Sequence, residues 1–176
     1  MPLPQDACVY LSIAANLDPR IHIHAAIQKL ASTVHLDDIS PFYRTEALGR
    51  PEQPDYLNGV ARIHTPLSPE ALKNDVLRPL EAQLGRKRTA DSYAARTIDL
   101  DMLLYNDIIR ANETLTLPDP DIVERVFLCA GLLSLAPDLV LPGDNCPLHN
   151  RVDKEALATL EIDAAFSRSM KELLTP

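Results

Sequence analysis

The sequence predicts an α+β fold in which helices pack on a mainly antiparallel sheet. Apolar alternation typical of strands and apolar spacing typical of helices follow one another in the order strand–helix–strand–strand–helix–strand. This order is the split βαβ arrangement of ferredoxin-like domains. The chain has 176 residues, of which 46% are hydrophobic, enough for one domain with a sizeable core. We therefore expect a single ferredoxin-like αβα sandwich over residues 1–176.

The first strand and the first helix are expected near the N-terminus. Residues 7–16 place apolar side chains from Val9 to Ile13 on one side of an extended segment. Residues 18–33 carry apolar residues at helical spacing. Pro19 suits the first position of that helix, because the N–H that it lacks would be unpaired there in any case.

Two further strands are expected after this helix. Residues 38–48 are aromatic and β-branched, which favours a strand despite Pro41. Turn-forming residues fill 49–54. Residues 55–65 then predict the next strand, in which Gly59 is interpreted as a bulge.

The second helix is expected over residues 68–85. Ser68 is a good N-cap and Gly85 a good end, and Pro79 predicts a kink between them. The polar and basic residues 86–97 predict a loop.

The last predicted strand, 98–106, leads into a more irregular C-terminal part. Residues 108–118 predict a short hairpin, and 120–139 predict one or two helices that end at Pro137. We expect residues 146–176 to form a packed extension that ends in a helical piece.

Bulk properties limit the partners of the protein. The net charge of −8 argues against an RNA-binding ferredoxin-like domain, which needs a basic sheet face. Three widely spaced cysteines give neither a disulfide framework nor a zinc signature. No stretch is typical of a signal peptide or a membrane span. We expect a cytoplasmic protein, a monomer or weak dimer, that binds small molecules but no nucleic acid and no membrane.

Two aspartates interrupt the last strand, in the stretch "RTIDLDMLLY". Residues two apart in a strand share a face, so Asp99 and Asp101 are expected roughly 7 Å apart. The same alternation assigns residues to the two faces: Ile98, Leu100, Met102 and Leu104 toward the core; Asp99, Asp101, Leu103 and Tyr105 toward the other face. That other face is expected to stay available for a ligand.

The neighbourhood of these aspartates suggests a phosphate ligand. Two carboxylates repel one another unless cations lie between them, and Mg²⁺ favours one or two carboxylates together with substrate phosphates. Arg86, Lys87, Arg88 and Arg96 add cations that suit a triphosphate. Two aspartates on a solvated strand face often have no function, and a basic loop can be a solvated turn or be ion-paired with Asp91.

Four segments together resemble one family. Residues 40–63, 67–88, 96–107 and 116–142 are similar, in order and without large gaps over about 7–142, to 6-hydroxymethyl-7,8-dihydropterin pyrophosphokinases. The resemblance implies transfer of the β,γ-pyrophosphoryl group of ATP to the hydroxymethyl group of the reduced pterin. The products are AMP and the pterin diphosphate, in folate biosynthesis, and the reaction depends on two Mg²⁺ ions.

The resemblance also implies roles for individual residues. The metal ligands would be Asp99 and Asp101, and the residues assisting transfer would be Arg86, Arg96, Asp99 and Asp101. The nucleotide would be bound by Arg86, Arg88, Arg96, Ile98, Asp119 and Arg125. The pterin would be stacked or hydrogen-bonded by Thr45, Leu48, Tyr56, Asn58 and Phe127. Core packing remains the alternative for the two aromatic rings. Glu81 is interpreted as helix surface or a loop anchor.

The sequence departs from the family pattern in four places. Ala14-Ala15 replace a Gly-Ser pair, and Tyr93 followed by Ala94-Ala95 replaces Trp and a later Gly-Pro. Asp119 replaces a histidine that faces the triphosphate. It could turn into solvent, recruit another cation, or mark a site that has shifted to another substrate. The alternative function is therefore a divergent paralogue that binds pterin or nucleotide with weak or altered transfer.

Overall fold

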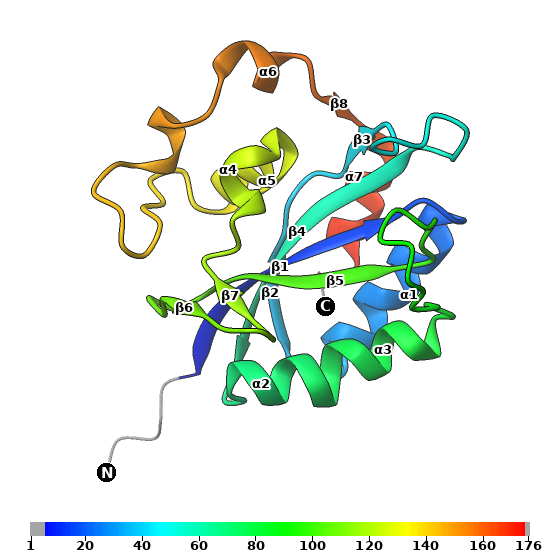
Figure 1. Cartoon of the computed structure of the whole chain (residues 1–176), viewed down its shortest axis with the longest axis horizontal. Coiled ribbons are helices and arrows are strands. Elements are labelled where there is room, and N and C mark those ends of the chain that lie inside the picture. The colour runs from blue at the N-terminus through cyan, green and yellow to red at the C-terminus, as the bar shows by residue number, and fades with distance from the viewer. Residues whose placement is uncertain (1–5, 175–176) are drawn as a thin grey trace.

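The computed structural model describes residues 6–174, so residues 1–5 and 175–176 of the expected domain lie outside it. A six-stranded antiparallel sheet forms its centre (Figure 1). The strands of this sheet are β1 (Ala7–Ala15), β2 (His35–Ile39), β3 (Tyr43–Thr45), β4 (Tyr56–Thr65), β5 (Asp99–Tyr105) and β8 (Glu161–Ile162). A separate hairpin consists of β6 (Arg110–Ala111) and β7 (Thr116–Leu117).

The strand order confirms the expected fold class. The sheet runs β5-β1-β4-β3-β8, and β2 also pairs with β4. The strand expected over 38–48 is divided into β2 and β3. Both pair with β4, and Pro41, which has no N–H to donate to a ladder, lies between them.

Helices cover both faces of the sheet. The helical segments are α1 (Pro19–Ala31), α2 (Pro69–Ala71), the π-helix η1 (Leu72–Leu77), α3 (Arg78–Gln83), α4 (Asp121–Glu124), α5 (Val126–Leu135), the 3₁₀ turn η2 (Leu148–Asn150), α6 (Lys154–Ala158) and α7 (Ala164–Glu172). Side chains of α1, η1, α3 and α7 join the first apolar cluster, and those of α5 join the second. Because α5 packs on β4, the second face is open over only part of its length.

A bulge in β5 changes which face its last residues occupy. Leu11 pairs with Met102 and Tyr10 with Leu104, so Leu103 is the extra residue. Leu104 therefore joins the second apolar cluster and Tyr105 the first. The faces expected for these two residues are wrong, whereas those of the residues before the bulge are confirmed.

The bulge predicted at Gly59 is also wrong. Gly59 pairs with Ile13 in an unbroken register. The glycine is needed for close packing instead, because a Cβ there would lie 2.6 Å from Cε1 of Phe42. Gly131 serves α5 in the same way, since its Cβ would lie 2.5 Å from Cγ2 of Val60.

The second helix begins and ends as predicted. Ser68 Oγ accepts the Ala71 N–H at 3.2 Å, and Gly85 has φ +81° just beyond α3. Between these ends, the π-helix η1 precedes Pro79. Such wide turns and prolines are the usual causes of a bend in a helix.

The C-terminal extension packs against the rest of the domain. β8 pairs with the outer edge of β3, and α7 contributes Phe166 and Met170 to the first apolar cluster. Within residues 6–174, no helix is long and apolar enough to cross a membrane.

Glu81 fastens α3 to β5. Its side chain is buried, and Oε1 accepts the Leu100 N–H at 2.9 Å. Oε2 accepts a hydrogen bond from Arg88 at 2.6 Å, which selects loop anchoring over helix surface for this residue. Burial raises the pKa of Glu81, although the Leu100 N–H opposes the shift.

We expect Glu81→Gln to change the pH dependence of stability. A carboxyl whose pKa is raised on folding binds its proton more tightly in the folded state, so the wild-type protein loses stability as pH rises through that raised pKa. Glutamine keeps the acceptor for Leu100 without this titration. In urea unfolding between pH 4 and pH 8, the free energy of unfolding of the variant should rise relative to that of the wild type as pH increases.

Glu81→Ala is the matched control. Like Glu81→Gln it lacks the titration, but it leaves the Leu100 N–H unpaired, so it should be about 1–3 kcal/mol less stable than Glu81→Gln over the whole pH range. Parallel stability curves for the wild type and Glu81→Gln would contradict the assignment.

Candidate active site

The candidate site lies on the part of the second sheet face that α5 leaves uncovered. Ala14 pairs with Asn58 on one side and with Asp99 on the other. Directly paired residues share a face, so one row crosses three strands from Asn58 to Asp99. Ser12 pairs with Asp101 in the neighbouring row. The sheet register thus brings the predicted metal ligands and a predicted pterin ligand to one surface.

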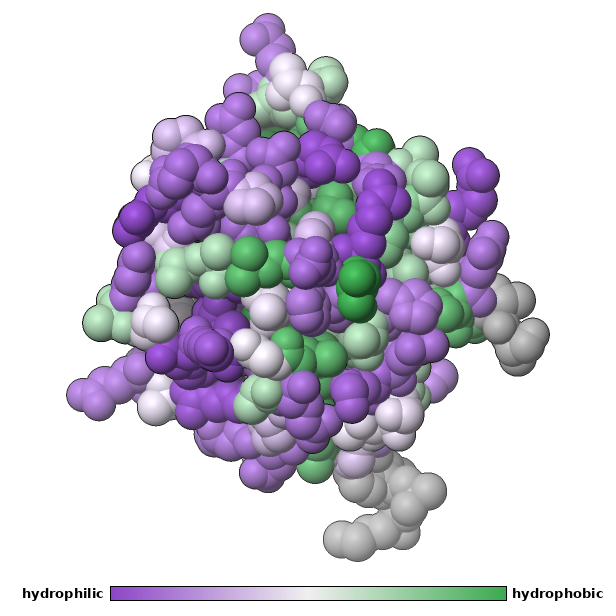
Figure 2. All heavy atoms as spheres, turned by 90° about the vertical axis from the view of Figure 1, so that its right-hand side faces the viewer, coloured by the Kyte–Doolittle hydropathy of each residue, from purple (hydrophilic) through white to green (hydrophobic). Residues whose placement is uncertain are grey.

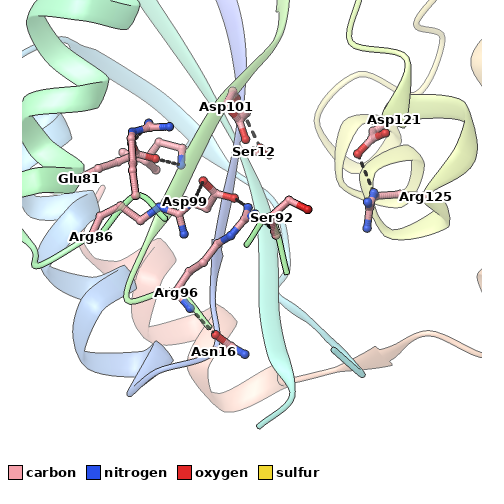
Figure 3. A network of polar contacts seen from close by, with 12 residues as sticks. Ser12, Asn16, Glu81, Arg86, Ser92, Arg96, Asp99, Asp101, Asp121 and Arg125 are labelled. Carbon is pink, nitrogen blue, oxygen red and sulfur yellow. Dashed lines mark hydrogen bonds and ion pairs between the residues drawn. The ribbon is translucent and has the colours of Figure 1, made fainter. Parts of the chain in front are cut away.

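Asp99 is held by two arginines. Arg96 Nη1 forms an ion pair with Oδ2, and Arg86 Nη2 lies 3.3 Å from Oδ1 (Figure 3). The Nε of Arg86 is buried and has no hydrogen-bond partner among residues 6–174. A buried N–H without a partner costs free energy, so this atom suits an oxygen of a ligand.

Asp101 differs from Asp99 because its carboxylate has no ion-pair or hydrogen-bond partner in the described part of the chain. Burial, together with the negative charges of Asp99, Glu81 and Asp119, raises the pKa of Asp101 to about 7. The side chain itself still reaches solvent, since it lines a cavity. Its charge is therefore available to a ligand cation.

This cavity measures about 330 Å³ and lies between η1, β5 and the β6–β7 hairpin. Lys73, Asp101 and Asp119 are among its lining residues. Lys73 Nζ also donates to the carbonyl of Thr114 in the hairpin. Lys73 was not predicted as a site residue, because nothing in its helical surroundings distinguishes it from a solvated lysine.

The donor set fits a hard divalent cation that brings further ligands with it. Asp99 and Asp101 offer carboxylate oxygens on one face of β5. The described residues contain no cluster of three or more metal-binding side chains, so the remaining ligands of Mg²⁺ would be substrate phosphates and water.

Asn16 ties three segments together at the end of β1. Its Oδ1 accepts the Arg96 N–H at 2.7 Å, and its Nδ2 donates to Gln53 Oε1 and to the Pro54 carbonyl, both at 3.2 Å. The side chain is buried. Sequence reasoning did not select Asn16, although an asparagine that ends a strand is a recognisable signal.

Residues outside the basic loop 86–97 also bind it. Arg50 pairs with Asp91 at 2.8 Å, so Asp91 is not the partner of the loop's own arginines. Gln53 Nε2 donates to the Tyr93 carbonyl at 2.9 Å. Arg88 extends from this loop to Glu81 rather than to Asp99.

Two other residues expected at the nucleotide take no part in the ion pairs of Asp99. The side chain of Ile98 is fully buried in the first apolar cluster, so only its backbone could meet a ligand. Arg125 is the residue before α5 and donates to Asp121 at 2.7 Å, across from Asp101 in Figure 3.

Asn58 is oriented by β3. Its Nδ2 donates to the Tyr43 carbonyl at 3.2 Å and to Thr45 Oγ1 at 2.9 Å. Both amide hydrogens are therefore used, and Oδ1 is the atom left to accept from a ligand. Tyr56, two residues before it, is half-buried.

The other predicted pterin residues frame this end of the sheet. Phe127 on α5 is half-buried and packs beside the second apolar cluster. Leu48 is 63% exposed in the turn after β3. Figure 2 looks onto the side where the strand ends and loops gather, and it shows a mainly hydrophilic surface with small hydrophobic patches. Such a surface suits a polar ligand better than a broad apolar partner.

Asp119 does not turn into solvent. Its Oδ1 accepts the Asp121 N–H at 2.8 Å at the start of α4, and its own N–H donates to the Leu103 carbonyl at 2.9 Å. It is half-buried in the wall of the cavity that contains Asp101. Burial raises the pKa of Asp119. The cavity therefore contains two carboxyl groups, those of Asp101 and Asp119, whose charges the protein does not fully neutralise.

Comparisons with known proteins identify the family of the chain. Residues 10–137 match the model of the 7,8-dihydro-6-hydroxymethylpterin-pyrophosphokinase family. A 2-amino-4-hydroxy-6-hydroxymethyldihydropteridine pyrophosphokinase of Haemophilus influenzae is 42% identical over 136 residues, which are 76% of this chain and 84% of that protein. The protein of the same name from Pseudomonas aeruginosa is 38% identical over 138 residues, 76% and 83% of the two chains.

A solved structure shares the fold. The HPPK-DHPS of Plasmodium falciparum, determined with pteroate, aligns with a TM-score of 0.61 at 12% identity. The alignment covers 85% of this chain and 42% of the Plasmodium chain. By the family match and the identity to its relatives, this chain belongs to the 7,8-dihydro-6-hydroxymethylpterin-pyrophosphokinase family.

Proposed function

We propose that this enzyme transfers the β,γ-pyrophosphoryl group of ATP to the hydroxymethyl oxygen of 6-hydroxymethyl-7,8-dihydropterin, with two Mg²⁺ ions held by Asp99 and Asp101. Membership of the family supports the reaction class and ATP as co-substrate. The observation that best supports the assignment of the site is the carboxylate pair on β5. Asp99 is bound to two arginines, and Asp101 faces the cavity with its charge not neutralised by the protein.

The transfer forms a bond between the pterin oxygen and the β-phosphorus and breaks the bond between that phosphorus and the oxygen that leaves with AMP. Little covalent help from the protein is needed, so positioning and charge neutralisation supply most of the rate. Arg86 and Arg96 contribute the guanidinium groups. When bound, Mg²⁺ neutralises phosphate charge and lowers the pKa of the attacking hydroxyl.

The pterin is bound on the Asn58 side of the row. Oδ1 of Asn58 accepts from an N–H at the ring edge, because β3 already uses the amide hydrogens. Tyr56 and Phe127 stack on the flat ring, as aromatic side chains do with heteroaromatic ligands. Backbone groups near Thr45 and Leu48 complete the edge. From Asn58 to Asp99 the row spans two strand spacings, roughly 10 Å.

Asp119 supports the second candidate function, a divergent enzyme with weak or altered transfer. An anionic side chain in the cavity wall repels a triphosphate. A titration with a non-hydrolysable ATP analogue, together with an AMP-release assay, separates the two candidates. Tight binding of pterin and nucleotide without AMP formation would favour the divergent enzyme.

Asp101→Asn and Asp99→Asn should each lower AMP formation roughly 100-fold or more while leaving the circular dichroism spectrum unchanged, because each removes a carboxylate from the cation site. Asp107→Asn, which alters an exposed carboxylate just beyond β5, is the control and should keep full activity. Wild-type turnover in Asp101→Asn at all Mg²⁺ concentrations would refute the metal assignment.

Asp119→Asn should tighten binding of a non-hydrolysable ATP analogue about tenfold, because it removes a negative charge from the cavity wall. Asparagine keeps an oxygen for the Asp121 N–H, so the start of α4 is preserved. Asp119→His should give at least the same gain, since it adds a donor. Unchanged calorimetric affinities in both variants would show that residue 119 does not face the nucleotide.

A further inference from the structure

The segment from β8 to α7 lies outside the stretch that matches the family, yet it is bound to the strand that orients Asn58. The family match ends at residue 137, whereas β8 and α7 span Glu161–Glu172. Tyr43 pairs with Ile162 and Arg44 with Glu161. A three-residue strand such as β3 gains a second neighbour through this pairing.

Both backbone groups of Phe42, the residue before β3, are held by this segment. The Phe42 carbonyl accepts the Asp163 N–H at 2.9 Å, and the Phe42 N–H donates to Ser167 Oγ at 2.8 Å. The Ser167 hydroxyl in turn donates to the Asp163 carbonyl at 2.7 Å. These contacts fix where β3 begins.

The carboxylate of Asp163 joins three elements. It accepts the Phe166 N–H at 3.1 Å as the N-cap of α7, forms an ion pair with Arg20 of α1, and lies 3.5 Å from Nη2 of Arg44 in β3. The Asp163 side chain is 8% exposed, whereas those of Arg20 and Arg44 are 54% and 38% exposed, so solvent reaches only the arginine side of these pairs.

Aromatic packing links α7 to the strand that carries Asn58. The rings of Phe166 and Phe42 meet edge to face with centroids 5.2 Å apart. The Phe42 ring in turn lies against Gly59, next to Asn58. Tyr43 and Thr45 then bind the Asn58 amide directly.

We propose that the segment Glu161–Glu172 is a positioning element for the pterin site, and that Asp163 and Ser167 are its positioning residues. This inference rests on the proposed function, because the pterin assignment of Asn58 belongs to it. The two residues touch no substrate. Ser167 acts by holding the Phe42 N–H, and the Asp163 carboxylate acts by capping α7 and pairing with Arg44 of β3, so that β3 keeps the Asn58 amide turned toward the ring edge. In the sheet, β1, β4 and β3 lie between β8 and β5, the strand of the proposed cation site.

The experiment measures steady-state kinetics of Ser167→Ala and Asp163→Asn with each substrate varied in turn. Loss of one of these half-buried partners should raise KM for the pterin roughly tenfold, with KM for ATP within about twofold of wild type. Ser167→Thr keeps the hydroxyl and should restore the pterin KM. Lys171→Ala, which removes an α7 side chain paired with Asp38 of β2 rather than with β3, should behave as wild type.

Hydrogen exchange gives a second readout that does not depend on activity. Ser167→Ala should speed exchange in residues 42–45 and 56–58 and leave 99–105 unchanged. An equal rise in KM for both substrates would overturn the positioning role. So would an unchanged pterin KM despite faster exchange in β3.

Failure of the proposed function gives a different pattern. If the wild-type chain forms no AMP but binds 6-hydroxymethylpterin in calorimetry, only the transfer is refuted. The pterin dissociation constants of the same variants then decide the positioning role. A wild-type chain that binds no pterin overturns both proposals.

Discussion

The register of β1 is the constraint on which the site depends. β1 lies between β4 and β5 and pairs with both along nearly its whole length, so Ala14 has Asn58 on one side and Asp99 on the other. A shift of one residue in either pairing would turn the corresponding polar side chain into the apolar core beneath α1 and α3. Burial of the first apolar cluster therefore also fixes the distance between the two halves of the site.

Much of the fold was predictable because periodicity is local. The alternation in residues 98–102 correctly places Asp99 and Asp101 opposite the helices that cover Leu100. The same rule fails after the bulge at Leu103, because the bulge arises from pairing with β1 and leaves no trace in the composition of β5. The break between β2 and β3 had a local signal in Pro41, but only the structure shows that both parts pair with one strand.

The contacts that support the candidate site were less predictable than its charged side chains. Asp99 and Asp101 stand out because they are charged residues in an otherwise apolar strand. The arginines stand out because they cluster just before that strand. Asn16 and Glu81 gain their importance from partners 80 and 19 residues away. These two partners, the Arg96 and Leu100 N–H groups, are backbone groups, which carry no sequence identity. Patterns in a single sequence can therefore indicate candidate functional side chains. They indicate less readily the contacts that position those side chains.

The ion pairs of Asp99 have a consequence for the order in which ligands associate. Arg86 and Arg96 already share an anionic partner, so a polyphosphate arriving alone must compete with that carboxylate for both guanidinium groups. A divalent cation bound to Asp99, as proposed above, would release them. Each ligand would then lower the dissociation constant of the other by the same factor, as thermodynamic reciprocity requires. On that proposal, one carboxylate would make metal and nucleotide favour simultaneous occupancy.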